Sequence, residues 1–353
     1  MHLMWFVPSG GDESRLGDPS TAVRPTIDHL IVVAQAAEAA GFEAMLVPTG
    51  EMCLDGWVVG AALAQHTERI KFMVAFRPGF INPPVAARQA GTFDRMTGGR
   101  LLLNVVTGGH PDELARDGDF VDHAGRYDRT EEFLDVVLKS WHDPHFDHEG
   151  RFFKVVDGGV NQRPIQKPHP RIYLGGASEA AMQAAARYAD VYLMWGEPVD
   201  LMADRAAQAK AMAASLGRTL EVGTRFQIVC RETDEEARAD AEDIVASISD
   251  SYRQYIRGFT EKTDSVGQLR QNALRSDDEW LTDTLWNGFA RARTGAAVAL
   301  VGSGPTIKKA LDEYVDAGID TFILSGYRHD HEAERCGRWL TPLLDPATEP
   351  AQA

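Results

Sequence analysis

The sequence predicts an eight-stranded parallel (β/α)8 barrel, a TIM barrel, on three observations. Short apolar runs alternate with helical patterns along almost the whole chain. These runs are apolar on both faces, which is typical of strands buried in a parallel sheet. The length of 353 residues suits one such barrel with insertions.

Eight apolar runs are predicted as the barrel strands: 3–7, 44–48, 70–76, 101–106, 171–174, 191–195, 225–230 and 321–324. Helices are predicted between them at 27–40, 85–96, 129–140, 179–188, 201–216, 234–248 and 305–317. Several of these segments have the 3.6-residue apolar period, and the first ends at Gly41, a common helix stop. The repeated order of strand and helix favours a closed barrel over an open sheet.

Two stretches lie outside the predicted strands and helices of the barrel. Residues 143–167 are rich in Gly, Pro, His and aromatic side chains, which predicts a hairpin-like insertion. Residues 249–289 form a long polar connection, and we expect them to act as a mobile lid. No linker separates two cores, so residues 1–345 are expected to be one domain and residues 346–353 a tail.

Charge and cysteine content restrict the function class. The net charge of −16 disfavours binding to nucleic acid or to an anionic membrane surface. Cys53, Cys230 and Cys336 form no disulfide framework, which fits a reducing cytoplasm. We find neither a signal-peptide pattern nor an apolar run of membrane-spanning length, so a cytoplasmic protein is expected.

The active site of a β/α barrel lies at the carboxyl ends of its strands. In this chain those ends carry arginines, glycine-rich turns, aromatic side chains and one thiol. Glycine turns before helices suit a phosphate, and arginines suit a sulfonate or phosphate oxyanion. No nucleophile triad and no carboxylate cluster accompanies them, so we expect a phosphate-bearing cofactor, an anionic substrate and no metal.

Longer motifs at these strand ends carry a family resemblance: 47–57 (Val-Pro-Thr-Gly-x-x-Cys-x-Asp-x-Trp), 75–78, 86–90, 104–108, 195–198, 263–268 and 324–327. Over residues 1 to about 345 the chain resembles the FMNH2-dependent alkanesulfonate monooxygenase branch of the bacterial luciferase-like flavin monooxygenases. The resemblance implies a two-component enzyme that receives FMNH2 from a separate NAD(P)H-dependent flavin reductase. With O2 it would cleave the C–S bond of an organosulfonate to sulfite and an aldehyde, as a homo-oligomeric dimer or tetramer.

Site residues follow from the same resemblance, position by position. Catalytic roles fall on Cys53, Arg225, Arg293 and Tyr327. Cofactor contacts fall on Asn104, Thr107, Tyr127 and the phosphate turn Gly176, Ala177 and Ser178. Substrate contacts fall on Trp195, Gln227, Arg328 and His329.

Two positions depart from the family pattern. Gln227 stands where the family has a histidine, and a glutamine cannot titrate near neutral pH. Arg328 stands where relatives have proline before the histidine. Because both side chains suit hydroxyl groups or additional negative charge, a sugar sulfonate such as sulfoquinovose stays open beside an alkanesulfonate.

Simpler structural roles compete with these assignments. Cys53 could be a small buried hydrophobe, Arg225 the partner of a structural carboxylate, and Gln227 a partner of the backbone. The histidines at 110, 123, 142, 145 and 148 lack metal spacing and are expected on the surface. Two other functions also remain: a deazaflavin-dependent oxidoreductase of the same fold, and a non-catalytic flavin-binding protein.

Overall fold

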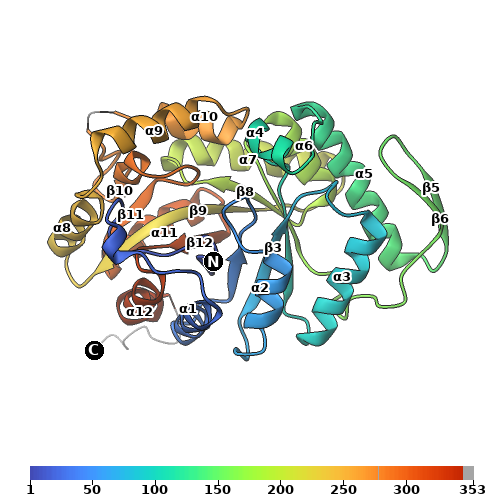
Figure 1. The fold of residues 1–353 in the computed structure, drawn as a ribbon, viewed down its shortest axis with the longest axis horizontal. Helices are drawn as coiled ribbons and strands as arrows, with labels where there is room; N and C mark the ends of the chain where they lie inside the picture. Colours follow the sequence, from blue (N-terminus) through green and yellow to red (C-terminus); the bar gives the residue numbers. More distant parts are fainter. Residues whose placement is uncertain (277, 345–353) are drawn as a thin grey trace.

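A computed structural model describes residues 1–276 and 278–344, and it contains a closed barrel of eight parallel strands (Figure 1). In ring order these are β1 (His2–Phe6), β2 (Ala44–Val47), β3 (Lys71–Phe76), β4 (Leu101–Val105), β7 (Ile172–Gly175), β8 (Val191–Trp195), β9 (Glu221–Arg231) and β12 (Thr321–Ser325). The ring closes where β12 pairs with β1 in parallel. The predicted fold class is confirmed, and each of the eight apolar runs falls on one ring strand.

Helices surround the ring: α1 (Ile27–Ala39), α2 (Gly56–Leu63), α3 (Pro83–Met96), α4 (Pro111–Arg116), α5 (His123–His142), α6 (Glu179–Tyr188), α7 (Val199–Ser215), α8 (Asp234–Val245), α11 (Gly304–Asp316) and α12 (His329–Trp339). Short 3-10 turns lie at η1 (Pro19–Thr21), η2 (Gly288–Arg291) and η3 (Thr341–Leu343). The sequence analysis missed α2, α4 and α12. The first two are short, and α2 is apolar on every side, so neither shows a clear helical period.

Strand β9 belongs to two parallel pairings in succession. Inside the ring it pairs with β8 as far as Arg225 and with β12 as far as Gln227. From Gln227 to Arg231 it pairs instead with β11 (Ala299–Ser303), a strand that the sequence analysis did not predict. The short β10 (Leu285–Trp286) then adds to β11 in antiparallel fashion. Strand β9 therefore leaves the ring at Gln227.

Two apolar layers hold the barrel together. The outer layer packs the strands against the helices and contains fully buried Trp5, Phe72 and Phe133. The inner layer fills the barrel and includes Met4, Met73 and Ile323. Because the inner layer fills the barrel interior, an open cavity is expected only at the strand ends.

The two predicted insertions have defined structures. Within 143–167, β5 (Phe146–Glu149) and β6 (Lys154–Gly158) pair as an antiparallel hairpin beside α5 (Figure 1, right). Within 249–289, α9 (Asp250–Glu261) and α10 (Val266–Ala273) lie along the upper edge in Figure 1. The predicted tail, 346–353, lies outside the described residues.

Among the described residues, no helix combines the length and hydropathy needed to cross a membrane.

Glu332 is a buried anchor between α12 and β9, and it gives a stability prediction. Its fully buried carboxylate accepts hydrogen bonds from the Cys230 backbone N–H (2.7 Å) and from Arg231 Nη1 (2.9 Å). Removing one partner of a buried ion pair costs about 3–5 kcal/mol. Glu332→Ala should therefore lower the free energy of unfolding by that amount in urea titrations. Glu149→Ala, which removes an exposed pair with Lys154, should change it little, and equal losses in the two variants would contradict the anchor role.

Candidate functional site

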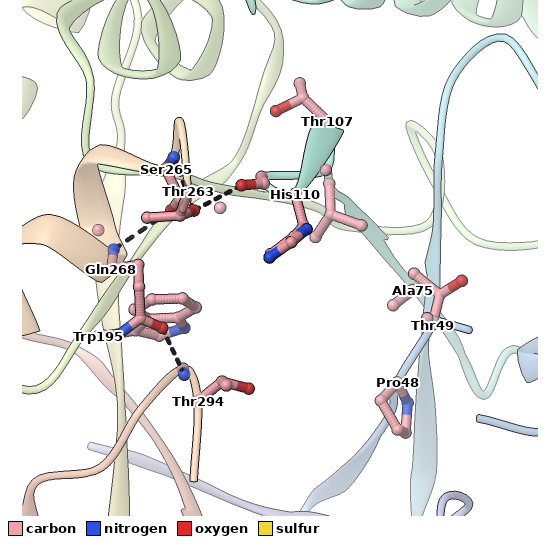
Figure 2. Close-up of a pocket in the computed structure, with 18 of the residues that line it drawn as sticks. Pro48, Thr49, Ala75, Thr107, His110, Trp195, Thr263, Ser265, Gln268 and Thr294 are labelled. Atoms are coloured by element: carbon pink, nitrogen blue, oxygen red, sulfur yellow. Dashed lines mark hydrogen bonds between the residues drawn. The ribbon is translucent and has the colours of Figure 1, made fainter. Parts of the chain in front are cut away.

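A cavity of about 500 Å³ opens at the carboxyl ends of the strands. It is lined by the turns that follow β2, β3, β4, β7 and β8, and by α9, α10 and the segment at Thr294 and Gly295. Figure 2 shows Trp195 and Gln268 on one side of it and Pro48, Thr49 and Ala75 on the other. Nine predicted site residues line this cavity: Cys53, Asn104, Thr107, Tyr127, Gly176, Ala177, Ser178, Trp195 and Arg225.

Arg225 is the cation of the cavity wall that has no carboxylate partner among the described residues. It lies on β9, and its guanidinium stands 3.9 Å from the centre of the Phe6 ring, a cation–π contact. Its Nε and Nη2 atoms are buried and make no hydrogen bond to the described protein atoms. Burial, and then the neighbouring charge of Arg293, lower the pKa of Arg225 to about 9. The alternative role, pairing with a structural carboxylate, is not what the structure shows.

Arg293 and Tyr327 form a pair next to Arg225. Arg293 Nη1 donates to the Tyr327 hydroxyl at 3.0 Å. Neither side chain lines the cavity, yet both act electrostatically on Arg225. Burial raises the pKa of Tyr327, so its hydroxyl keeps its proton near neutral pH. The structure thus brings the two predicted arginines, Arg225 and Arg293, together. Of these two, Arg225 lines the cavity and Arg293 does not.

The turn between β7 and α6 has the form of a phosphate cradle. Ser178 caps α6, and its Oγ accepts from the Ala181 N–H at 3.1 Å, which leaves the hydroxyl proton free to donate. Gly176 has φ +154°, and a Cβ there would lie 2.8 Å from the Tyr127 hydroxyl and 2.6 Å from Ala181 Cβ. Only glycine fits, so backbone, Ser178 and Tyr127 can approach one anionic group at the start of a helix.

Cys53 lies in the turn after β2, which is fastened to the turns after β3 and β4. Glu113 accepts from the Glu51 N–H at 2.8 Å and from Arg77 Nη2 at 2.6 Å. Burial raises the pKa of the Cys53 thiol, and the negative charge of Glu113 adds to this effect. Cys53 is therefore a protonated thiol in the cavity wall at neutral pH.

The three remaining predicted substrate contacts do not line the cavity. Gln227 is fully buried where β9 leaves the ring, and its Nε2 donates to the Ala296 carbonyl at 3.1 Å. Arg328 pairs with Asp330 through two hydrogen bonds, the shorter 2.6 Å. His329 Nδ1 lies 2.8 Å from a carboxylate oxygen of Asp12. Gln227 thus has the backbone partner that the sequence analysis gave as its alternative role, whereas Asp330 and Asp12 were not predicted as partners of Arg328 and His329.

His110 is a cavity residue that sequence reasoning missed. It was expected on the surface, but it lines the cavity and stacks on Phe259 of α9, with ring centroids 4.1 Å apart. His123 also lines the cavity. Arg77 and Glu113 line the cavity as well, and they form the ion pair described above. The position of His110, directly after the turn that follows β4, could have indicated a place in the cavity. The spacing of the histidines, which was used to test for a metal site, gives no information on this point.

Helices α9 and α10 cover the cavity and are fastened to the barrel. Thr263 Oγ1 donates to the Gly109 carbonyl at 2.6 Å, and Gln268 Oε1 accepts from the Gly295 N–H at 2.8 Å (Figure 2). Arg126 Nη2 donates to Asp264 at 2.7 Å. These bonds place the predicted lid segment over the cavity.

Comparison with known proteins identifies the family. The profile of the luciferase-like monooxygenases matches residues 1–321, and the chain belongs to this family. Its fold is similar to a riboflavin lyase solved with modified FMN and riboflavin (TM-score 0.82, 20% identity, 98% of this chain and 91% of that chain covered). It is also similar to the EDTA monooxygenase from Chelativorans sp. BNC1 (TM-score 0.79, 20% identity, 99% and 94% covered). An F420-dependent secondary alcohol dehydrogenase shares the fold too (TM-score 0.68, 15% identity, 99% and 99% covered).

The protonation state of Cys53 gives a testable pH dependence. Because its thiol pKa is raised, the thiolate fraction is small at neutral pH and grows as the pH increases. Alkylation by iodoacetamide should be slow at neutral pH, and its rate should not level off below about pH 9. Cys230 and Cys336 are fully buried and should not react in the folded protein. Cys53→Ser should abolish labelling, while a rate plateau near neutral pH would mean that Cys53 is a thiolate.

Proposed function

We propose that this protein is a two-component monooxygenase that uses FMNH2 and O2 to cleave the C–S bond of an organosulfonate. The observation that carries the proposal is Arg225, a partly buried cation in the cavity wall with no carboxylate partner among the described residues. An unpaired guanidinium in such a place calls for an anionic ligand. A sulfonate spreads one charge over three oxygens, which suits the fork of the guanidinium.

The cavity also fits a flavin mononucleotide. The turn from Gly176 to Ser178, with the Tyr127 hydroxyl, would hold the phosphate. Asn104 has a buried Oδ1 atom with no partner among the described residues, and it would bond the ring system. Trp195 provides an aromatic wall for the planar group. When bound, the reduced flavin supplies two electrons and activates O2.

The proposed reaction balances without any metal. One oxygen atom of O2 becomes the aldehyde oxygen, the other leaves as water, and sulfite departs as the C–S bond breaks. The two electrons would come from FMNH2, and a separate NAD(P)H-dependent reductase would regenerate it from FMN. Within this scheme Arg225 binds and orients the sulfonate, and Arg293 with Tyr327 fixes the electrostatic environment of Arg225. Helices α9 and α10 exclude water.

An alkanesulfonate fits the wall near Arg225 better than a sugar sulfonate does. The side chains of Leu193 and Ile323, on the two strands that flank Arg225, are apolar and line the cavity. Gln227 and Arg328, the two residues that favoured a sugar sulfonate, lie outside the lining. An apolar wall cannot pair sugar hydroxyls, which disfavours binding a sulfosugar at this position.

We further propose that the protein acts in the cytoplasm as a homo-oligomer. All three cysteines are free thiols, as a reducing compartment favours.

Arg225→Ala tests the proposal. Losing a charge-assisted contact to a desolvated anion should weaken sulfonate binding by about 2–5 kcal/mol, so sulfite release should nearly vanish. The measurement is sulfite released from alkanesulfonates with FMNH2 delivered by a flavin reductase. Arg328→Ala is the matched control, since Arg328 pairs with Asp330 and lies outside the cavity wall, and it should keep most activity.

The outcomes separate the competing functions. A wild-type protein that transfers hydride from a reduced deazaflavin and releases no sulfite would be an oxidoreductase of the F420-dependent kind. Tight FMNH2 binding with no turnover on any sulfonate would indicate a flavin-binding protein.

The lid gives a second prediction. Deleting residues 262–267 removes the bond from Thr263 to Gly109 and the pair between Arg126 and Asp264. Water then reaches the cavity, so the coupling of FMNH2 oxidation to sulfite release should collapse and hydrogen peroxide should appear instead. The barrel should keep its circular dichroism spectrum. Unchanged coupling in the deletion variant would refute the lid role.

A further inference from the structure

His110 differs from the other histidines of the described residues. Both of its ring nitrogens are buried and have no protein partner. By contrast, His29 and His329 share Asp12, and His148 bonds Glu132. His110 stands at the N-cap position of α4, but its side chain makes no capping bond. A buried imidazole without partners is costly, so its nitrogens are available to a ligand in the cavity.

The imidazole is held in place from two sides. Its ring stacks on Phe259 with an interplanar angle of 15°. The preceding residue, Gly109, accepts the hydrogen bond from Thr263 and packs so closely on Ser265 that a Cβ would come within 2.7 Å of the Ser265 Cβ. Figure 2 shows the ring of His110 projecting into the cavity. A side chain fixed in this way loses little conformational freedom when it binds.

The strand register places the turn that carries His110 next to the turn that carries Ser178, and both turns line the same cavity. Strand β4 pairs with β7, with Val105 opposite Leu174, so the turn at 107–110 adjoins the turn at 175–178. Two carboxylates near this wall already form ion pairs, Glu113 with Arg77 and Asp264 with Arg126. Donors on this wall include the imidazole of His110 and the hydroxyls of Thr107, Ser178 and Tyr127.

This donor set suits a phosphate monoester, whose oxygens accept several hydrogen bonds at once. We propose that His110 donates a hydrogen bond to the phosphate of the reduced flavin, and that it thereby selects the mononucleotide over riboflavin. The inference rests on the proposed function, because it assumes that the cavity binds flavin.

The test compares reduced FMN with reduced riboflavin, which differ only in the phosphate. His110→Phe keeps an aromatic ring on Phe259 and removes both nitrogens. In anaerobic titrations followed by protein fluorescence, the variant should lose about tenfold to a hundredfold in affinity for reduced FMN, and less than about threefold for riboflavin. His110→Asn keeps a donor and should lose less. His145→Phe makes the same change at an exposed hairpin position and should alter neither affinity.

Each other outcome overturns the inference. Equal losses for the two flavins would make His110 a packing residue of the wall, and unchanged FMN affinity would exclude a phosphate contact. If His110→Phe does not fold by circular dichroism, the ratio of the two affinities in His110→Asn decides. A wild-type protein that binds neither flavin would instead refute the proposed function, and the inference would fall with it.

Discussion

The pairing of β12 with β1 is the constraint on which the rest of the molecule depends. It turns a row of parallel strands into a ring, and all eight carboxyl ends then face one opening. Residues far apart in the sequence, such as Cys53 after β2 and Arg225 on β9, share one cavity for this reason. The inner apolar layer fills the barrel below them, so the chemistry is confined to the turns above.

The ring also explains how a lone guanidinium is tolerated. In the strand register Arg225 lies between Trp195 of β8 and Ile323 of β12. Its guanidinium also makes a cation–π contact with the aromatic ring of Phe6. A second cation, Arg293, lies close enough to lower its pKa. An arrangement that brings two like charges together at a partly buried site is unfavourable in isolation. It becomes favourable when an anion binds, which is the physical basis of the function proposed above.

Sequence reasoning located the ring strands because these depend on local signals, and it named nine residues of the cavity wall because the family resemblance covers whole strand-end motifs. Runs that are apolar on both faces identify ring strands, and a glycine turn before a helix marks the strand-end turn at Gly176. The direction of single side chains depends on distant partners, and sequence reasoning could not supply it. Gln227 does not line the cavity because β9 leaves the ring at this residue and its side chain bonds the Ala296 carbonyl. Arg328 does not line the cavity because its side chain pairs with Asp330. His110 faces inward because a helix more than a hundred residues later stacks on it.

The departure of β9 from the ring has an architectural consequence. After Gln227 the chain pairs with β11, and it supplies no further ring strand until β12 begins at Thr321. The excursion between them contributes Phe259, Gln268 and Gly295 to the cavity. Within the excursion, α8 and α11 pack on the barrel, whereas residues 249–289 contain no ring strand. The length of this segment can change at little cost, because closing a longer loop adds little entropy penalty. The barrel with α8 and α11 is therefore a fixed scaffold, and grafting residues 249–289 of a relative would alter what enters the cavity while leaving that scaffold intact.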